Sequence, residues 1–363
     1  MIKVTSFDVG QADCILVHMD KELNGKRRYF NLLIDGAYKK NQIGKKLKES
    51  LGKECIQGIV VTHVDQDHIS GILDIVKGMN EKIRNAFVLF NKYDENMISY
   101  NEAKDLSILL KTNFPRNMQI CSYSRNYWDS LVSQLNQNPK YLEVELLSIV
   151  QRYKCPKIDS NKVYITIVGP SIEEVRRLMR DWKQYNESKK NEEKPGKNAR
   201  VINEASIVLL IEFDGSAILL SGDGYFDQDK PCTIRKKLEK IKNLDKIDLI
   251  KASHHGALEN NEGLVDVVKK YHCKKVFFTI SQKEFVDKME EESKHPKKAP
   301  VAKHPDPQLL KDLHDIRNQN GDSVELVCSE DINDIRLTNY MKKEIVMTVK
   351  DDKDEKYCIN CNI

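Results

Sequence analysis

The chain places four side chains that can bind a metal ion within six consecutive residues, and this cluster constrains the fold more than any other feature. The cluster consists of His63, Asp65, Asp67 and His68. An apolar run at 59–61 precedes it and predicts a buried strand, whereas the segment 69–76 has the apolar spacing of a helix. The cluster therefore lies where a buried strand turns into a helix, a rigid position at the mouth of a sheet.

Histidine and aspartate alternate on this tight turn, so the four side chains cannot all face one ion. We expect His63 and Asp65 to serve one ion and Asp67 and His68 to serve a second, which is the arrangement of two-metal hydrolases. The alternative is a polar turn in which Asp67 only caps the helix. Four possible ligands within six residues favour the metal site over that alternative.

Two later strands are predicted to end in side chains of the same chemistry. The apolar run 216–221 leads into a Gly-Asp-Gly turn that contains Asp223, and its glycines allow the backbone to pass close to another group. The run 247–252 leads into the pair His254 and His255, which a glycine follows. Each motif alone is weak, but three strands that end in histidine or aspartate can converge on one site.

In this order the motifs resemble those of the metallo-β-lactamase-fold hydrolases, and most of all the ComEC-like soluble hydrolase domains. The resemblance covers about residues 3 to 329 and is carried by the stretches 4–13, 32–37, 63–68, 220–223, 253–256 and 304–307. It implies an α/β (α+β) fold, an αββα sandwich of two β-sheets flanked by helices. We expect a single domain over residues 1–349, with polar insertions near 170–200 and 282–303 and a polar C-terminal tail at 350–363.

Apolar runs and helical periodicity predict the individual elements. Strands are expected at 2–8, 13–19, 29–35, 57–62, 85–91, 163–168, 205–213, 216–221, 246–252, 275–280, 323–328 and 343–349. Helices are expected at 41–51, 68–79, 101–111, 126–136, 170–189, 231–242, 260–271 and 307–319.

The resemblance also implies roles for the site residues. His63 and Asp65 would hold the first ion, while Asp67, His68 and His254 would hold the second. Asp223 would bridge the two ions.

The choice between His254 and His255 stays open. We prefer His254 as the ligand because it comes first after the strand, and His255 would then lie near the substrate. Asp67 and His255 are therefore also candidates for catalytic roles. Asp35 is expected to orient a ligand rather than to bind an ion.

The segment before the Asp223 strand departs from the wider superfamily, which has a further histidine ligand there. Residues 201–208 contain no histidine, and Asn203 and Ser206 are the nearest candidates. The first ion would then have few nitrogen ligands, and oxygen-rich ligation favours manganese or magnesium over zinc. We expect two divalent ions, manganese or zinc, with magnesium as a further possibility.

Lysine and arginine gather near several of the site loops, although the formal net charge is only +4. The four groups lie at 39–48, 189–200, 235–242 and 294–303. Acidic neighbours make an ordinary solvated surface the alternative interpretation. A polyanionic substrate is the functional interpretation, with Lys251 and Lys303 as candidate contacts, because cationic side chains supply affinity for phosphates.

The composition predicts a soluble, cytoplasmic protein without a membrane segment. Charged residues make up 31% of the chain, and no apolar stretch approaches the roughly 20 residues of a membrane span. No signal peptide is visible at the start. The nine cysteines are scattered, which is typical of reduced thiols.

These observations predict a metal-dependent phosphodiesterase, most simply a nuclease that acts on DNA through a hydroxide activated by two metal ions. Protein partners are possible but are not indicated by any motif. One alternative is a regulatory or binding module with weak catalysis. Another is a hydrolase of a small ester or phosphocholine-type substrate, which a narrow apolar pocket would favour.

His304 precedes a helix expected to begin near Pro307, and free backbone N–H groups at such a position attract anions. We therefore expect His304 to contact the scissile phosphate or to protonate the leaving oxygen, rather than to bind a metal ion. His295 is the competing candidate, and a surface position is the alternative for His304.

Overall fold

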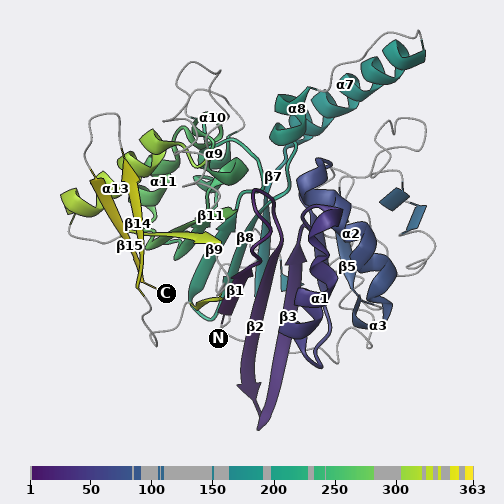
Figure 1. The fold of residues 1–363 in the computed structure, drawn as a ribbon, viewed down its shortest axis with the longest axis horizontal. Helices are drawn as coiled ribbons and strands as arrows, with labels where there is room; N and C mark the ends of the chain where they lie inside the picture. The colour runs from purple at the N-terminus through teal and green to yellow at the C-terminus, as the bar shows by residue number, and fades with distance from the viewer. Residues whose placement is uncertain are drawn as a thin grey trace.

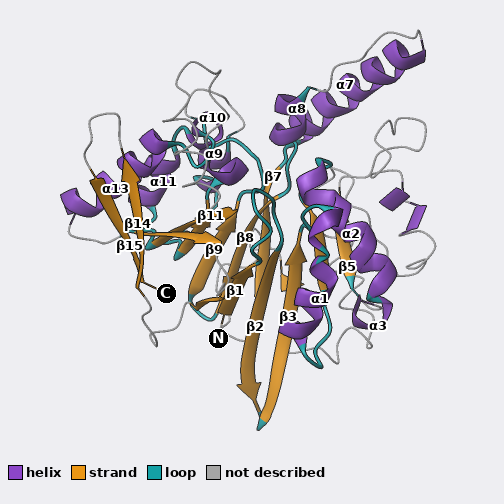
Figure 2. Cartoon of the chain, viewed as in Figure 1, coloured by secondary structure: helices purple, strands orange, loops and turns teal. Residues whose placement is uncertain are grey.

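Two β-sheets pack face to face, and helices cover their outer faces (Figures 1 and 2). The predicted αββα sandwich is confirmed as an α+β fold with two mixed sheets. The computed structural model describes residues 2–83, 86–90, 105–106, 108–109, 149–150, 163–190, 198–227, 233–241, 243–281, 304–320, 324–329, 334–336, 344–350 and 356–362.

The first sheet contains strands from the N-terminal part of the chain and one late strand. Its order is β13 (Asp334–Arg336), β1 (Ile2–Ser6), β2 (Ile15–Leu23), β3 (Lys26–Ile34), β4 (Gly58–Val61) and β5 (Phe87–Phe90). The pairs from β13 to β3 are antiparallel, whereas β3, β4 and β5 run parallel.

The second sheet contains strands from the later part of the chain. Its order is β12 (Glu325–Ser329), β11 (Lys275–Ser281), β10 (Leu249–Lys251), β9 (Ser216–Leu220), β8 (Val208–Phe213), β7 (Val163–Gly169) and β6 (Ile149–Val150). The strands from β9 to β12 run parallel, and β8 is antiparallel to both of its neighbours. A separate antiparallel pair is formed by β14 (Glu344–Lys350) and β15 (Lys356–Asn362).

Helices of the described segments cover the two sheets. Near the first sheet lie η1 (Lys39–Asn41), α1 (Ile43–Leu51), α2 (Gln66–Gly78) and α3 (Asn80–Ile83). The later helices are α7 (Ile172–Lys190), α8 (Ala199–Glu204), α9 (Ile234–Leu238), η3 (Ser253–Gly256), α10 (Leu258–Asn261), α11 (Leu264–Lys270) and α13 (Pro307–Asn320). Figure 1 shows α7 extending away from the sheets next to α8. No helix in the described ranges is both long and apolar enough to cross a membrane.

Three apolar clusters hold the four layers together. The central one joins the inner faces of both sheets, and it includes Val17 of β2 and Ile211 of β8. The second packs α1 and α2 on the first sheet, and the third packs α9, α11 and α13 on the second sheet. Because successive strand residues face opposite sides, strands covered on both faces are apolar throughout. All residues of β4 and β5 are buried accordingly.

Most predicted elements lie within a few residues of the observed ones. The expected helix at 231–242 is shorter, since α9 spans Ile234–Leu238, and the expected helix at 260–271 is replaced by α10 and α11. Residues 356–362, which we assigned to a polar C-terminal tail, pair with β14 as strand β15. The expected insertion near 170–200 contains α7, whereas the one at 282–303 and the helix at 126–136 lie outside the described residues.

The fold brings the predicted site loops to one edge of the sandwich. In the first sheet, β3 ends directly before Asp35, and the neighbouring parallel strand β4 ends directly before Thr62. In the second sheet, β9 leads to Asp223, and its parallel neighbour β10 leads to His254. The carboxyl ends of parallel strands meet at the same edge, so both sheets contribute to one site.

Two glycines allow the α2 helix to approach the β3 loop closely. Gly36 donates its N–H to the carbonyl of His68 at 2.8 Å, and Gly71 donates to the carbonyl of Ala37 at 2.9 Å. A Cβ atom on Gly71 would lie 1.8 Å from the carbonyl oxygen of Gly36. This backbone contact sets the position of His68 relative to Asp35.

We expect Gly71→Ala to lower the free energy of unfolding by more than about 2 kcal/mol, because the added methyl group overlaps backbone atoms that cannot move without separating α2 from the loop. Gly78→Ala in the same helix is the matched control. A Cβ atom on Gly78 meets nothing within 4 Å, so this substitution should change stability by less than about 1 kcal/mol. Urea denaturation of the metal-free protein measures both, and equal stabilities would contradict the packing argument.

Candidate metal centre

The carboxylate of Asp223 lies at the centre of the candidate site, with side chains of the two sheets on either side of it. It is 2% exposed. Its Oδ2 atom lies 3.7 Å from Nε2 of His63 and 3.9 Å from Nε2 of His254. Its Oδ1 atom lies 3.5 Å from Nε2 of His68. The two oxygens of one carboxylate thus face two different groups of possible ligands.

The first group gathers around Oδ2 of Asp223. It contains His63, Asp65 and His254, and Oδ2 of Asp65 lies 3.9 Å from Nε2 of His63. Separations of this size allow the atoms to share one ion at ordinary coordination distances. His254 therefore offers the nitrogen ligand that segment 201–208 lacks.

The second group gathers around Oδ1 of Asp223. Oδ2 of Asp67 lies 3.6 Å from Nε2 of His68 and 3.2 Å from Nε2 of His255. This arrangement differs from the preferred sequence-based assignment, in which His254 joined Asp67 and His68. The structure places His255 in that position and His254 on the other side of Asp223.

The backbone at the histidine pair explains how neighbouring residues reach opposite sides of Asp223. His254 and His255 have φ values of 46° and 53°, so both adopt the left-handed conformation that costs energy for residues other than glycine. Gly256 follows at φ 93°, where a Cβ atom would lie 2.6 Å from Cβ of Pro305. Strain of this kind at adjacent residues is typical of functional loops.

Groups behind the histidines fix the orientation of their rings. Asp35 accepts a hydrogen bond from Nδ1 of His68 at 2.7 Å, and it also accepts from the backbone N–H and the hydroxyl of Thr62. Asp35 therefore fixes the ring of His68, and its role toward a metal ligand stays a prediction. Nδ1 of His255 lies 3.1 Å from the carbonyl oxygen of Thr279. Both rings therefore direct Nε2 toward the cluster, as metal-binding histidines do.

His254 is oriented by two asparagines. Its Nδ1 lies 3.1 Å from Oδ1 of Asn260 and 3.5 Å from Nδ2 of Asn203. Ser206 supports the bridging residue instead, because its hydroxyl oxygen accepts a hydrogen bond from the backbone N–H of Asp223 at 3.3 Å. The two candidates proposed from the sequence as substitutes for a histidine thus hold other residues in place.

Lys251 lies beneath the site and is 1% exposed. Its Nζ atom lies 2.8 Å from Oδ2 of Asp13 and donates to the carbonyls of Gly222 and Ala252. The expectation that Lys251 contacts substrate is wrong, because its ammonium group is enclosed by protein. Asp13 also lies 3.4 Å from Nδ1 of His255 and 3.7 Å from Nδ1 of His68.

The electrostatics of the cluster favour a bound cation. Burial lowers the pKa of His63 to about 4, so its ring is neutral and able to act as a ligand at neutral pH. Burial also disfavours charge on His68, but the carboxylates of Asp223 and Asp67 outweigh it and raise its pKa well above the usual value. The carboxylates around His68 therefore favour positive charge at this place.

Three buried ligand atoms lack a hydrogen-bond partner among the described residues, namely Nε2 of His63, Nε2 of His68 and Oδ1 of Asp223. Unpaired buried polar atoms are costly and rare unless they bind something. His63, His68 and Asp223 each offer one ligand atom, and these atoms lie within 4.8 Å of one another. The donor set of imidazole nitrogens and carboxylate oxygens fits divalent ions such as manganese or zinc.

His304 lies at the edge of the cluster, with its ring centroid 5.1 Å from that of His254. The helix α13 begins at Pro307, as predicted, but its N-terminus is not open to an anion. The carboxylate of Asp306 accepts hydrogen bonds there from the backbone N–H groups of Gln308 and Leu309. Lys303 and His295 lie outside the described residues.

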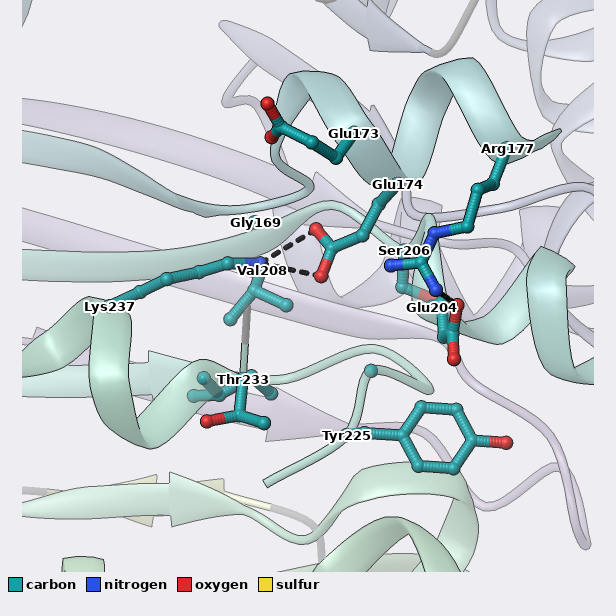
Figure 3. Close-up of a pocket in the computed structure, with 12 residues that line it drawn as sticks. Gly169, Glu173, Glu174, Arg177, Glu204, Ser206, Val208, Tyr225, Thr233 and Lys237 are labelled. Atoms are coloured by element: carbon teal, nitrogen blue, oxygen red, sulfur yellow. Dashed lines mark hydrogen bonds and ion pairs between the residues drawn. The ribbon is translucent and has the colours of Figure 1, made fainter. Parts of the chain in front are cut away.

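A pocket of about 340 Å³ lies next to the cluster, between the start of α7, the end of α8 and α9 (Figure 3). Two neighbours of Asp223 form part of its wall. Gly224 follows Asp223 in the sequence, and Ser206 accepts a hydrogen bond from the backbone N–H of Asp223. Nζ of Lys237 lies 2.7 Å and 3.0 Å from the two carboxylate oxygens of Glu174, and the ring of Tyr225 forms the opposite side.

Apart from Asp35, the sequence motifs did not identify the residues that orient the candidate ligands. Thr62, Thr279 and Asn260 come from separate elements, and their roles depend on distances that a sequence does not contain. Asp13 could have been noticed, because it ends the opening motif at 4–13 and is an acidic residue next to an apolar strand.

Comparisons with known proteins give structural similarity only. No protein-family profile matches the chain, and no curated protein matches it. Among solved structures it is similar to a long form of RNase Z from yeast, with 11% identity and a TM-score of 0.43 over 92% of this chain. The chain spans 41% of that protein's length.

Two further similar structures match over their whole length. Human tRNase Z, short form, has 10% identity and a TM-score of 0.38, and this chain covers 99% of it. An isothiocyanate hydrolase from gut bacteria of Delia radicum has 11% identity and a TM-score of 0.36, with 100% covered. These solved structures are metallo-β-lactamase-fold proteins. At such low similarity, the functional inference has to come from the site residues of this chain.

We expect Asp35→Asn to weaken manganese binding by about 10- to 100-fold, because the amide no longer provides the negative charge that orients His68 and increases its basicity. Asp74→Asn is the control, since Asp74 is a partly exposed carboxylate on the same helix as His68. Calorimetric titration with Mn²⁺ measures the affinity of each variant. Unchanged affinity in Asp35→Asn would show that Asp35 has no influence on the centre.

Proposed function

We propose that the chain is a metal-dependent hydrolase of phosphodiesters and that it acts on DNA. The observation that carries this proposal is the division of ligands by Asp223, whose two oxygens face two separate groups of nitrogen and oxygen atoms. A single carboxylate placed between two such groups is the ligand arrangement of two-metal hydrolases.

His63, Asp65 and His254 would hold one divalent ion, and Asp67, His68 and His255 would hold the other. Asp223 would serve both. Bound divalent ions supply Lewis acidity and make water a nucleophile near neutral pH. The protein's own part is to fix these ligands through Asp35, Thr279 and Asn260, so that little reorganisation is needed when substrate binds.

His304 is the proposed proton donor to the leaving oxygen. The centroid of its ring lies 5.1 Å from that of His254. His304 belongs to neither of the two ligand groups. The adjacent Asp306 donates its backbone N–H to the carbonyl of Gly256, which ties this segment to the histidine loop. A histidine held beside the cluster can transfer a proton near neutral pH.

Exposed lysines on η1 and α1 support a polyanionic substrate. Lys39, Lys40, Lys45 and Lys48 are exposed in this segment. The segment adjoins the opening turn of the site, because Nζ of Lys46 donates to the carbonyl of Asp8 at 2.9 Å. Lys39 of this segment pairs with Asp74 at 3.8 Å, while the partly buried Lys237 pairs with Glu174 at 2.7 Å and Arg235 with Asp266 at 2.7 Å. The basic surface proposed for DNA is therefore centred on η1 and α1.

The pocket beside Asp223 supports a second candidate, a hydrolase of a small phosphodiester or ester with a cationic group. Glu173, Glu174 and Glu204 lie in its lining, against Arg177 and Lys237, so acidic groups are in excess. The guanidinium of Arg200 lies over the ring of Tyr225, 5.4 Å from its centroid, and a quaternary ammonium group would compete for this ring. A regulatory module with weak catalysis is the least supported candidate, because both ligand groups contain histidines.

The assignment of the histidine pair predicts different losses in two variants. His255→Ala should remove the ion held with Asp67 and His68, whereas His254→Ala should remove the ion held with His63 and Asp65. Each variant should retain about one manganese ion by elemental analysis after dialysis, against two for the parent protein. His314→Ala, on α13, is the control and should retain both. Full manganese content in His255→Ala would contradict the assignment.

For catalysis, we expect cleavage of plasmid or single-stranded DNA in the presence of Mn²⁺, and Asp223→Asn should slow it by at least about 100-fold, because both ligand groups lose their shared carboxylate. Asp214→Asn, in the turn between β8 and β9, is the control, since Asp214 is exposed and pairs with Lys21 at the surface. Gel assays measure the rate.

A choline phosphodiester assayed in parallel separates the two candidates. The small-substrate candidate would be favoured if the protein turned over the choline phosphodiester, did not cleave DNA, and turned over the choline phosphodiester more slowly in the Tyr225→Leu variant. DNA cleavage unaffected by Tyr225→Leu would favour the nuclease.

A further inference from the structure

A lysine is buried within the candidate centre, where no solvent can reach its charge. Lys251 ends strand β10 and is 1% exposed. Lysines are almost never fully buried unless they are paired. Its ammonium group has three donors, and the protein provides a partner for each: Asp13, the carbonyl of Gly222 and the carbonyl of Ala252.

The partners of Lys251 belong to loops that carry the proposed ligands. Gly222 directly precedes Asp223, and Ala252 is followed by Ser253 and the histidine pair. Asp13 also donates its backbone N–H to the carbonyl of Asp67 at 3.1 Å. Nζ of Lys251 itself lies 3.9 Å from Oδ1 of Asp223. The ammonium group is therefore close enough to influence any cation that binds there.

Asp13 lies close to two of the proposed ligand histidines, but it is near their Nδ1 atoms, whereas the proposed ions would bind their Nε2 atoms. It lies near Nδ1 of His68 and of His255, whereas Nε2 of both rings faces the group around Asp67 and Asp223. Together with these two histidines it could hold an ion of its own. The Lys251 ammonium lies 2.8 Å from Asp13 and supplies the positive charge instead.

The charges of the cluster balance when this ammonium is counted. Five carboxylates converge on the site, those of Asp13, Asp35, Asp65, Asp67 and Asp223. Two divalent ions and Lys251 together carry as many positive charges as these carboxylates carry negative ones, with the histidines neutral. A buried cluster with this balance avoids the large cost of unpaired charge in a low dielectric.

We propose that Lys251 is a built-in cation that neutralises Asp13 and thereby limits the centre to two divalent ions. This inference rests on the proposed metal centre. Lys251 is a positioning and charge-balancing residue, since its ammonium group is enclosed by Asp13 and the carbonyls of Gly222 and Ala252. A lysine with a purely structural role, here called a brace, would also connect the loops. In that case the affinity for Mn²⁺ would not depend on the sign of the charge at Asp13.

The sign of the charge gives opposite expectations for two substitutions. Asp13→Asn leaves the ammonium unbalanced beside Asp223 and should weaken binding of Mn²⁺ by at least about 10-fold. Lys251→Met leaves the Asp13 carboxylate unbalanced and should strengthen Mn²⁺ binding or add an ion at Asp13. The double substitution Asp13→Asn with Lys251→Met restores the balance, so its affinity should return to within about threefold of the parent value.

Calorimetric titration with Mn²⁺ and elemental analysis measure affinity and ion number, and thermal unfolding in chelator reports whether each variant folds. Lys246→Met, at an exposed lysine that precedes β10, is the control for loss of one positive charge. Lys251→Met removes the ammonium partner of the buried Asp13 carboxylate, and this loss can prevent folding. In that case, the comparison of Asp13→Asn with the double variant tests whether the sign of the charge matters.

A double variant that binds as weakly as Asp13→Asn, or more weakly, would overturn the inference in favour of a brace. Unchanged affinity in Asp13→Asn would overturn it as well. If the parent protein binds no Mn²⁺, the proposed metal centre itself fails. Two bound ions in the parent, with variants that depart from these expectations, would reject only the role of Lys251.

Discussion

The arrangement of the candidate centre depends on one carboxylate that is shared between two groups of ligands. Asp223 comes from the second sheet, whereas His63 and His68, which face its two oxygens, come from the first. A short carboxylate can face both groups only if the two sheet edges are held at a fixed separation. The central apolar cluster, formed by both inner sheet faces, provides that separation.

The histidine pair shows how local strain serves this arrangement. Two adjacent residues in a regular strand would face opposite sides of the sheet, and in a helix they would diverge by about 100°. The left-handed backbone of His254 and His255 places Nε2 of His254 3.9 Å from Oδ2 of Asp223 and Nε2 of His255 3.2 Å from Oδ2 of Asp67. The energetic cost of that backbone is balanced by contacts with Asn260 and Thr279.

The sequence predicted much of the fold because its strands are apolar runs and its helices are periodic. It also predicted which histidines and aspartates the fold brings together around Asp223, since they lie in short motifs directly after those strands. It did not predict which histidine of the pair serves which group, because that depends on two φ angles. It misplaced Lys251, whose charge suggested an exposed contact, because the carboxylate that buries it lies far away in the sequence at Asp13.

The two halves of the centre are separated by a long stretch of chain, and this has a consequence for folding. His63 to His68 can take up their turn through local contacts, but they meet Asp223 and His255 only after the two sheets have packed. Contacts between distant segments form slowly, because their loops are costly to close. A cation that needs ligands from both sheets would bind the packed sandwich and not its separate halves. Its concentration would then govern the free energy of unfolding of the packed sandwich.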